Sequence, residues 1–103
     1  MRTVHKYHLT GMGVGVLGDP EGAMFGEITL EVPAGAKFLS VGVQDGGLVV
    51  WAEVFTYEDT PKQTRHLFLA GTEKKLPDGK SFHFIGTVQQ DWFVGHLYEV
   101  FAS

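Results

Sequence analysis

The chain of 103 residues contains no cysteine, and this absence removes several classes of protein at once. Without thiols there are no disulfide bonds, no thiolate nucleophiles and no metal sites built on cysteine. We therefore expect a fold that depends on apolar packing and on association between subunits.

Long apolar runs are also missing. No window approaches the roughly 18 consecutive apolar residues that cross a bilayer. The first residues, MRTVHK, lack the apolar core of a signal peptide. We therefore expect a cytoplasmic protein with no membrane partner.

Positive charge is scarce. The formal net charge is −4, and charged residues make up 19% of the chain against 44% hydrophobic residues. This balance is typical of a globular protein. A protein that binds nucleic acid needs a basic surface to release counterions from phosphates, so we expect no nucleic-acid partner.

Alternation of apolar and polar residues with a period of two is what the chain does contain. Residues 26–32 alternate in this way, which is typical of a strand with one solvent-exposed face. A turn follows at residues 33–36, and Asp45 with Gly46 predicts a tight hairpin. Residues 48–55 are apolar at nearly every position, which predicts the central strand of a small antiparallel sheet.

The remaining segments predict more strands and no helix of useful length. The further predicted strands are residues 3–9, 37–44, 65–70, 81–85 and 94–101. Those at 65–70 and 81–85 both end in a Gly-Thr pair and are predicted to be neighbours that leave the sheet in similar turns. We predict a single all-β domain over residues 1–103, either an antiparallel sandwich or a small open barrel of about seven strands.

The predicted strands also give candidates for the core. In the first strand we expect Val4, Tyr7 and Leu9 to be buried. In the strand at residues 37–44, Leu39 and Val43 are expected on one face together with Val41.

A glycine-rich apolar arm is predicted at residues 11–25, after the first strand. Its start, GMGVGVLG, has neither the spacing nor the strand-to-helix setting of a nucleotide-binding fingerprint. One interpretation is a flexible loop between two strands. The other is a lid or arm, because Met12, Val14, Val16 and Leu17 are too apolar for a loop in water. Such an arm would cover this subunit's core or a neighbour's.

Constellations that carry catalysis are absent from the sequence. There is no nucleophile motif, no zinc-protease motif and no calcium-binding loop, and the acidic residues are scattered. His66, His83 and His96 would hold a metal only if the sheet brought them together, and no fixed spacing supports that. We predict no catalytic residues, no metal and no cofactor.

Polar residues beside aromatic ones form the candidate ligand site. Amides next to aromatic rings can hold a planar polar ligand by hydrogen bonding and stacking. Arg65, together with Lys37, Lys74 and Lys75, would supply positive charge for an anionic ligand, with a solvated loop as the alternative interpretation of Lys74 and Lys75. The alternative is that Trp92 belongs to the core and the glutamines line a turn. The candidate ligand-binding residues are Gln89, Gln90, Trp92, His96, Arg65 and Trp51.

Read together, the segments resemble a family of small phage and prophage proteins of unassigned function. The matching segments are VHKYHL at 4–9, VPAGAKFLSV at 32–41, VQ at 43–44, LVVWAEV at 48–54, GT at 71–72 and at 86–87, VQQ at 88–90, and FVGHLYE at 93–99. Residues 11–25 look like an insertion relative to that family. The resemblance implies a phage or prophage origin and brings no activity with it.

Three functions follow as hypotheses. The first is a non-enzymatic, phage-encoded binding protein that sequesters a host factor in the host cytoplasm, with a nucleotide-derived immune signal as the expected ligand. The second is an accessory or assembly protein of the virion. The third is a small metal-dependent enzyme that uses the three histidines.

Association is expected under each hypothesis. A β domain of about 100 residues without disulfides has a small free energy of unfolding. Its edge strands also need protection from pairing with other chains. We predict a homo-oligomer, most simply a twofold dimer, in which the arm reaches a partner subunit.

Overall fold

The computed structural model of the chain describes residues 1–9, 26–57, 59–73, 75–90 and 93–102. The arm at residues 11–25, Lys74 and Trp92 lie outside the described residues.

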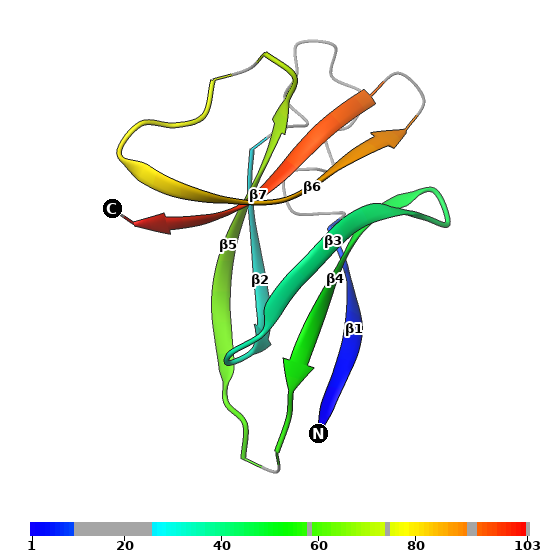
Figure 1. Cartoon of the computed structure of the whole chain (residues 1–103), viewed down its shortest axis with the longest axis vertical. Coiled ribbons are helices and arrows are strands. Elements are labelled where there is room, and N and C mark those ends of the chain that lie inside the picture. Colours follow the sequence, from blue (N-terminus) through cyan, green and yellow to red (C-terminus); the bar gives the residue numbers. More distant parts are fainter. Residues whose placement is uncertain (10–25, 58, 74, 91–92, 103) are drawn as a thin grey trace.

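Within these ranges, seven strands form two antiparallel sheets (Figure 1). The strands are β1 (Arg2–His8), β2 (Gly26–Pro33), β3 (Lys37–Gln44), β4 (Gly47–Phe55), β5 (Lys62–Gly71), β6 (Lys80–Gln90) and β7 (Phe93–Ala102). One sheet has the order β1-β4-β3 and the other has the order β2-β5-β7-β6. The predicted all-β class and strand number are confirmed, and the sheets form a sandwich and not a closed barrel. The described part of the chain contains no helix long and apolar enough to cross a membrane.

Both sheets contribute to one apolar core because each presents alternate residues to it. The buried core residues are Leu9, Ile28, Leu30, Val32, Ala36, Leu48, Val50, Ala52, Val54, Leu67, Leu69, Val88 and Leu97. Strand β4 supplies four of them and pairs with β1 on one side and β3 on the other. The prediction that residues 48–55 form a central strand is therefore confirmed.

Two predicted turns have the backbone that their sequences require. In the turn before β3, the Ala36 amide donates a hydrogen bond to the Pro33 carbonyl (3.2 Å), and Gly35 has a positive φ of 85°. Between β3 and β4, Asp45 and Gly46 have φ values of 53° and 80°. Two consecutive positive φ values are typical of the tight hairpin turn that Asp-Gly favours.

The turn predicted at residues 86–87 is wrong. Strand β6 continues to Gln90, with a shift of register between Phe84 and Gly86. A Cβ at position 86 would lie 3.1 Å from the Cγ1 of Val41, in the opposite sheet. Gly86 therefore permits β6 and β3 to approach closely. The predicted adjacency of β5 and β6 is wrong as well, because β7 lies between them.

Some predicted burial is also wrong. Val4 is 56% exposed because it lies opposite Glu53 on the outer face of the three-stranded sheet. Tyr7 packs against the core and Leu9 is buried, as expected. Leu39 falls at a register shift in β3 and is exposed, so it does not share a buried face with Val41.

Candidate functional site

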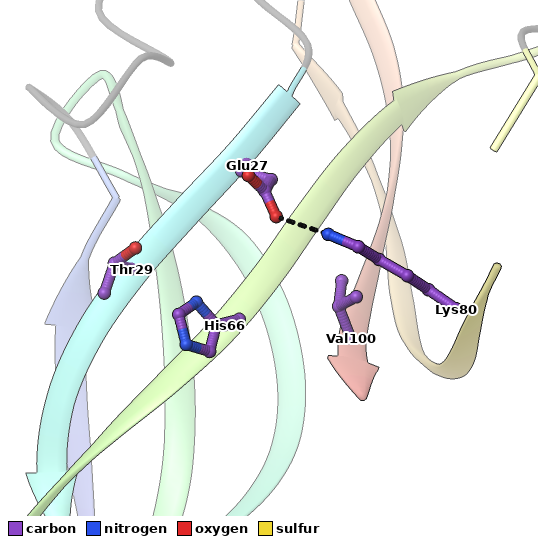
Figure 2. Close-up of a pocket in the computed structure, with 5 residues that line it drawn as sticks. All are labelled: Glu27, Thr29, His66, Lys80 and Val100. Atoms are coloured by element: carbon purple, nitrogen blue, oxygen red, sulfur yellow. Dashed lines mark hydrogen bonds and ion pairs between the residues drawn. The ribbon is translucent and has the colours of Figure 1, made fainter. Parts of the chain in front are cut away.

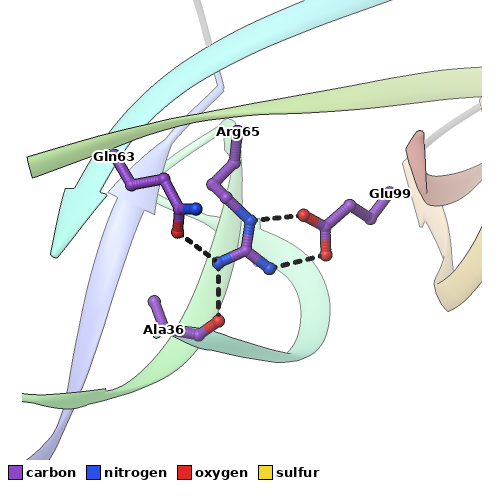
Figure 3. Close-up of polar contacts among 4 residues, drawn as sticks. All are labelled: Ala36, Gln63, Arg65 and Glu99. Atoms are coloured by element: carbon purple, nitrogen blue, oxygen red, sulfur yellow. Dashed lines mark hydrogen bonds and ion pairs between the residues drawn. The ribbon is translucent and has the colours of Figure 1, made fainter. Parts of the chain in front are cut away.

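A charged pair lies on the inner face of the four-stranded sheet, where the sequence period places mainly apolar residues. Arg65 of β5 and Glu99 of β7 form a two-pronged ion pair (Figure 3). The Nη2 of Arg65 donates to the Oε1 of Glu99 at 2.8 Å, and its Nε donates to Oε2. The two side chains are only 16% and 7% exposed. Solvent therefore screens this pair far less than a surface ion pair.

The guanidinium of Arg65 also joins the two sheets. Its Nη1 donates to the backbone carbonyl of Ala36 at 2.8 Å, just before β3, and reaches the Oε1 of Gln63 at 3.5 Å. Its Cζ lies 5.1 Å from the ring centroid of Phe38 in β3, in the geometry of a cation–π contact. Most N–H groups of Arg65 are thus already used, and Glu99 balances its charge.

A cavity of about 270 Å³ opens beside this ion pair. Its lining residues are Ala36, Lys37, Phe38, Arg65, His83, Glu99 and Phe101. His83 is the partner of Glu99 across the β6–β7 ladder, so their side chains leave the same face of the sheet. Phe101 is 46% exposed and supplies an aromatic wall. The cavity therefore combines two aromatic rings with charged groups, which suits a small polar ligand.

Sequence reasoning selected Arg65 and missed Glu99 as its partner. Glu99 lies two residues after Leu97, which is fully buried, so both side chains are on the same face of β7. The alternation along the strand therefore predicts that Glu99 faces the core. A buried carboxylate needs a cation nearby. That requirement was the signal that would have paired Glu99 with Arg65.

The other predicted ligand residues do not gather around this cavity. His96 lies on the outer face of the four-stranded sheet, where its Nε2 and Nδ1 each lie 2.9 Å from a hydroxyl, that of Thr72 and that of Thr87. Gln89 is exposed near the end of β6. The side chain of Gln90, like the whole of Trp92, lies outside the described part of the chain.

Trp51 occupies a third surface, the outer face of the three-stranded sheet. Its ring lies against Gly42 of β3, and its ladder partner in β1 is Lys6. Arg65, His96 and Trp51 therefore point to three different faces. The structure does not bring these three residues into one site.

The three histidines proposed for a metal are likewise divided between faces. His83 lines the inner cavity, whereas His66 and His96 lie on the outer face of the same sheet. Among the described residues, no three His, Asp or Glu side chains are grouped as metal ligands would be.

A second hollow of about 320 Å³ lies on that outer face (Figure 2). Its lining residues are Glu27, Thr29, His66, Lys80 and Val100. The Nζ of Lys80 reaches from β6 to the Oε1 of Glu27 in β2, at 3.2 Å. Both side chains are largely exposed, so this pair contributes little to stability.

Aromatic residues cover the middle of the same outer face. Phe82 and Tyr98 pack edge to face with centroids 5.9 Å apart, and Phe68 and Phe84 extend the row on either side. Phe84 is 53% exposed. We call Phe68, Phe82, Phe84 and Tyr98 the aromatic row.

Fold and site together define a small β-sandwich with one ionic cluster on its inner face and a cavity beside it. The chain belongs to the family described as a domain of unknown function (DUF7352), whose model matches residues 1–103. No match was found among curated proteins or among solved structures.

Proposed function

We propose that this protein is a non-enzymatic binding protein, made by a phage or prophage, that sequesters a nucleotide-derived immune signal of the host. The ligand would occupy the cavity beside Arg65 and Glu99. The observation that supports this proposal is the combination of aromatic and charged groups around a single small cavity. A phage origin rests on the sequence resemblance, and the place of action would be the host cytoplasm.

Each class of lining residue has a role in this proposal. Phe38 and Phe101 offer aromatic surface to a nucleobase, and stacking of a base on an aromatic side chain contributes about 1–3 kcal/mol. The carboxylate of Glu99 can accept an N–H from the ligand with a lone pair that Arg65 leaves free.

Calorimetry with purified protein and a panel of cyclic nucleotides and cyclic ADP-ribose isomers tests the proposal. We expect at least one of them to bind, and Phe101→Ala to weaken that binding at least tenfold. Phe84→Ala, which removes an exposed ring on the opposite face, is the matched control and should bind normally. Absence of binding heat with every compound would refute the proposal.

The aromatic row favours a second candidate function, that of an accessory or assembly protein of the virion. Of these four rings Phe84 is exposed and the others are half-buried, and rings on a sheet face are typical of surfaces that meet another protein. Mass spectrometry of purified phage particles separates the two functions. A protein that sequesters a signal should be absent from the particles, whereas an assembly protein should be present in them.

Under either function we propose a homo-oligomer, most simply a twofold dimer. Light scattering on the intact chain tests this, with a variant in which a short turn replaces residues 11–22 as the comparison. An intact chain that runs as a monomer of 11.3 kDa at micromolar concentration would contradict the proposal. Equal association of both proteins would show that the arm is not needed for it.

A further inference from the structure

The two sheets meet along one side of the sandwich and have free edges along the other. On the first side β3 and β6 are the outermost strands, and they approach so closely that Val41 lies against Gly86. On the second side the outermost strands are β1 and β2, and neither pairs with a further strand in the described part of the chain. An unpaired strand edge is a template for a strand of another chain.

Backbone hydrogen bonds show which residues of β1 face its free edge. The Met1 nitrogen donates to the Thr56 carbonyl and the Thr56 amide donates to the Met1 carbonyl, both at 2.9 Å. Backbone groups in an antiparallel ladder alternate between the two sides of a strand. The N–H and C=O groups of Arg2, Val4 and Lys6 therefore point away from β4, toward the free edge.

The free edge of β2 follows from the same alternation. The Ala34 amide donates to the Pro61 carbonyl at 2.9 Å, in the register of the β2–β5 ladder. The N–H and C=O groups of Glu27, Thr29 and Glu31 therefore point away from β5.

The residues at the two free edges have complementary charges. Arg2 and Lys6 are four residues apart on β1, and Glu27 and Glu31 are four residues apart on β2. All four side chains are exposed. Opposite charges across a strand pair are favourable and like charges are unfavourable. The charges therefore favour pairing of β1 with β2 of another copy over pairing of two identical strands.

Contacts within the chain leave these side chains available. The Nε of Arg2 lies 3.7 Å from the Oε2 of Glu53, and the Nζ of Lys80 lies 3.2 Å from the Oε1 of Glu27. Arg2 and Glu27 are largely exposed, so these two ion pairs contribute little to stability. Glu31 accepts a hydrogen bond from a hydroxyl of β5 at 3.2 Å. Each carboxylate keeps lone pairs for a second donor.

The directions of β1 and β2 fit a twofold axis parallel to the strands. The two strands run in opposite directions (Figure 1). The start of β1 and the end of β2 lie at the same end of the sandwich, because Met1 and Ala34 are hydrogen-bonded to the two ends of the short loop at residues 56–61. Rotation about such an axis exchanges the two sheets without sliding them. It therefore places β1 antiparallel to β2 of the partner subunit.

We propose that two copies of this chain associate about a twofold axis by pairing β1 of each copy with β2 of the other. The register pairs three residues of β1 with three of the partner subunit: Arg2 with Glu31, Val4 with Thr29, and Lys6 with Glu27. Each layer of the dimer is then one continuous sheet of seven strands, with three from one copy and four from the other. This inference rests on the proposed homo-oligomer and specifies its interface.

Engineered cysteines report this pairing directly, because the chain has none of its own. Hydrogen-bonded partners on antiparallel strands have Cα atoms about 5.5 Å apart, which a disulfide can span. A mixture of Val4→Cys and Thr29→Cys chains should give, on oxidation, a cross-linked pair that contains one chain of each kind. A mixture of Val4→Cys and Glu31→Cys chains, offset by two residues, is the register control and should cross-link much less. Equal yields from the two mixtures would overturn the proposed register.

The double variant Val4→Cys with Thr29→Cys tests the closed symmetry. In a twofold dimer both disulfides join the same two chains, so oxidation should give a species of twice the chain mass and no larger one. A ladder of larger species would show a head-to-tail assembly and would overturn the twofold arrangement.

Reversal of charge tests the contact between Arg2 and Glu31. Arg2→Glu should raise the dissociation constant of the dimer about tenfold, because like charges then face each other at both strand pairs. Adding Glu31→Arg should restore association. Arg2→Glu also removes the contact with Glu53, which Glu31→Arg does not replace, so the recovery reports the contact between subunits. Lys75→Glu makes the same change of net charge outside β1 and β2 and should leave association unchanged. Failure of the double variant to recover would show that these two residues do not meet.

These outcomes separate the interface from the proposals on which it rests. An intact chain that stays monomeric in light scattering would refute both the homo-oligomer and this interface. A dimer without the cross-link between positions 4 and 29 would refute the interface alone. Binding of a nucleotide is measured by calorimetry and stands or falls independently of either result.

Discussion

The ring of Trp51 lies directly against the backbone of Gly42, on the outer face of the three-stranded sheet. A Cβ added at position 42 would be 2.8 Å from Cζ3 of Trp51 and 3.0 Å from Cη2. Real Cβ atoms do not approach ring carbons this closely. Glycine is therefore required at position 42 for the tryptophan ring to lie this close to β3.

The first prediction is that Gly42→Ala destabilises the protein by about 1–3 kcal/mol, because the added methyl group forces the ring or the strand to move. Urea denaturation measures the change. Trp51→Leu should remove most of this penalty when the two substitutions are combined, since the clash then disappears. A double variant in which the two costs simply add would contradict the stated cause.

The second prediction concerns the inner ion pair. Glu99→Ala leaves the charge of Arg65 buried without a partner, and we expect a loss of about 3–5 kcal/mol. Replacing both residues, by Arg65→Met with Glu99→Leu, should cost much less than Glu99→Ala alone. The matched control is Glu27→Ala, in the exposed pair with Lys80, with an expected loss of less than about 1 kcal/mol. Equal losses for Glu99→Ala and Glu27→Ala would show that burial of the pair does not matter.

The third prediction concerns the turn between β2 and β3. Gly35 has a φ of 85°, and nothing lies within 4 Å of the position of a Cβ there. Gly35→Ala should therefore cost about 1–2 kcal/mol through backbone strain alone. Gly35→Asn should cost less than alanine, because asparagine tolerates positive φ better. Thermal unfolding compares the two variants, and a larger loss for asparagine would contradict the argument.

The fourth prediction is a loss of stability in alkali that depends on Tyr7. Burial raises the pKa of the Tyr7 hydroxyl above its usual value of 10.0 by desolvation. Below that pH the folded and unfolded states both keep the proton. As the pH rises through 10.0, the unfolded state loses it first, so stability falls until the pH passes the folded-state pKa.

Tyr7→Phe should lack this loss. Urea midpoints for both proteins, measured from about pH 8 to about pH 11, should show the unmodified chain falling further than the variant. Parallel curves over the whole range would show that the Tyr7 hydroxyl is not responsible.

Local patterns in the sequence were sufficient for the class and for much of the strand map. The run at residues 48–55 predicts a central strand because it is apolar at nearly every position, and β4 lies between β1 and β3 in its sheet. The Asp45-Gly46 and Gly35 turns were predictable because positive φ depends on the residue itself. The family match adds no activity to this.

Strand order, register and pairing between distant residues were decided only by the tertiary structure. The Gly-Thr pair at residues 86–87 looks like the turn after β5, yet Gly86 stays within β6 because Val41 of the other sheet packs against it. The ion pair of Arg65 with Glu99 joins residues on two strands far apart in the chain. The local sequence determines the backbone conformation that a residue prefers. It also determines which residues of a strand share one face. The packing of the two sheets around one core decides which face of each strand is buried. It also decides which side chains from distant strands come into contact there.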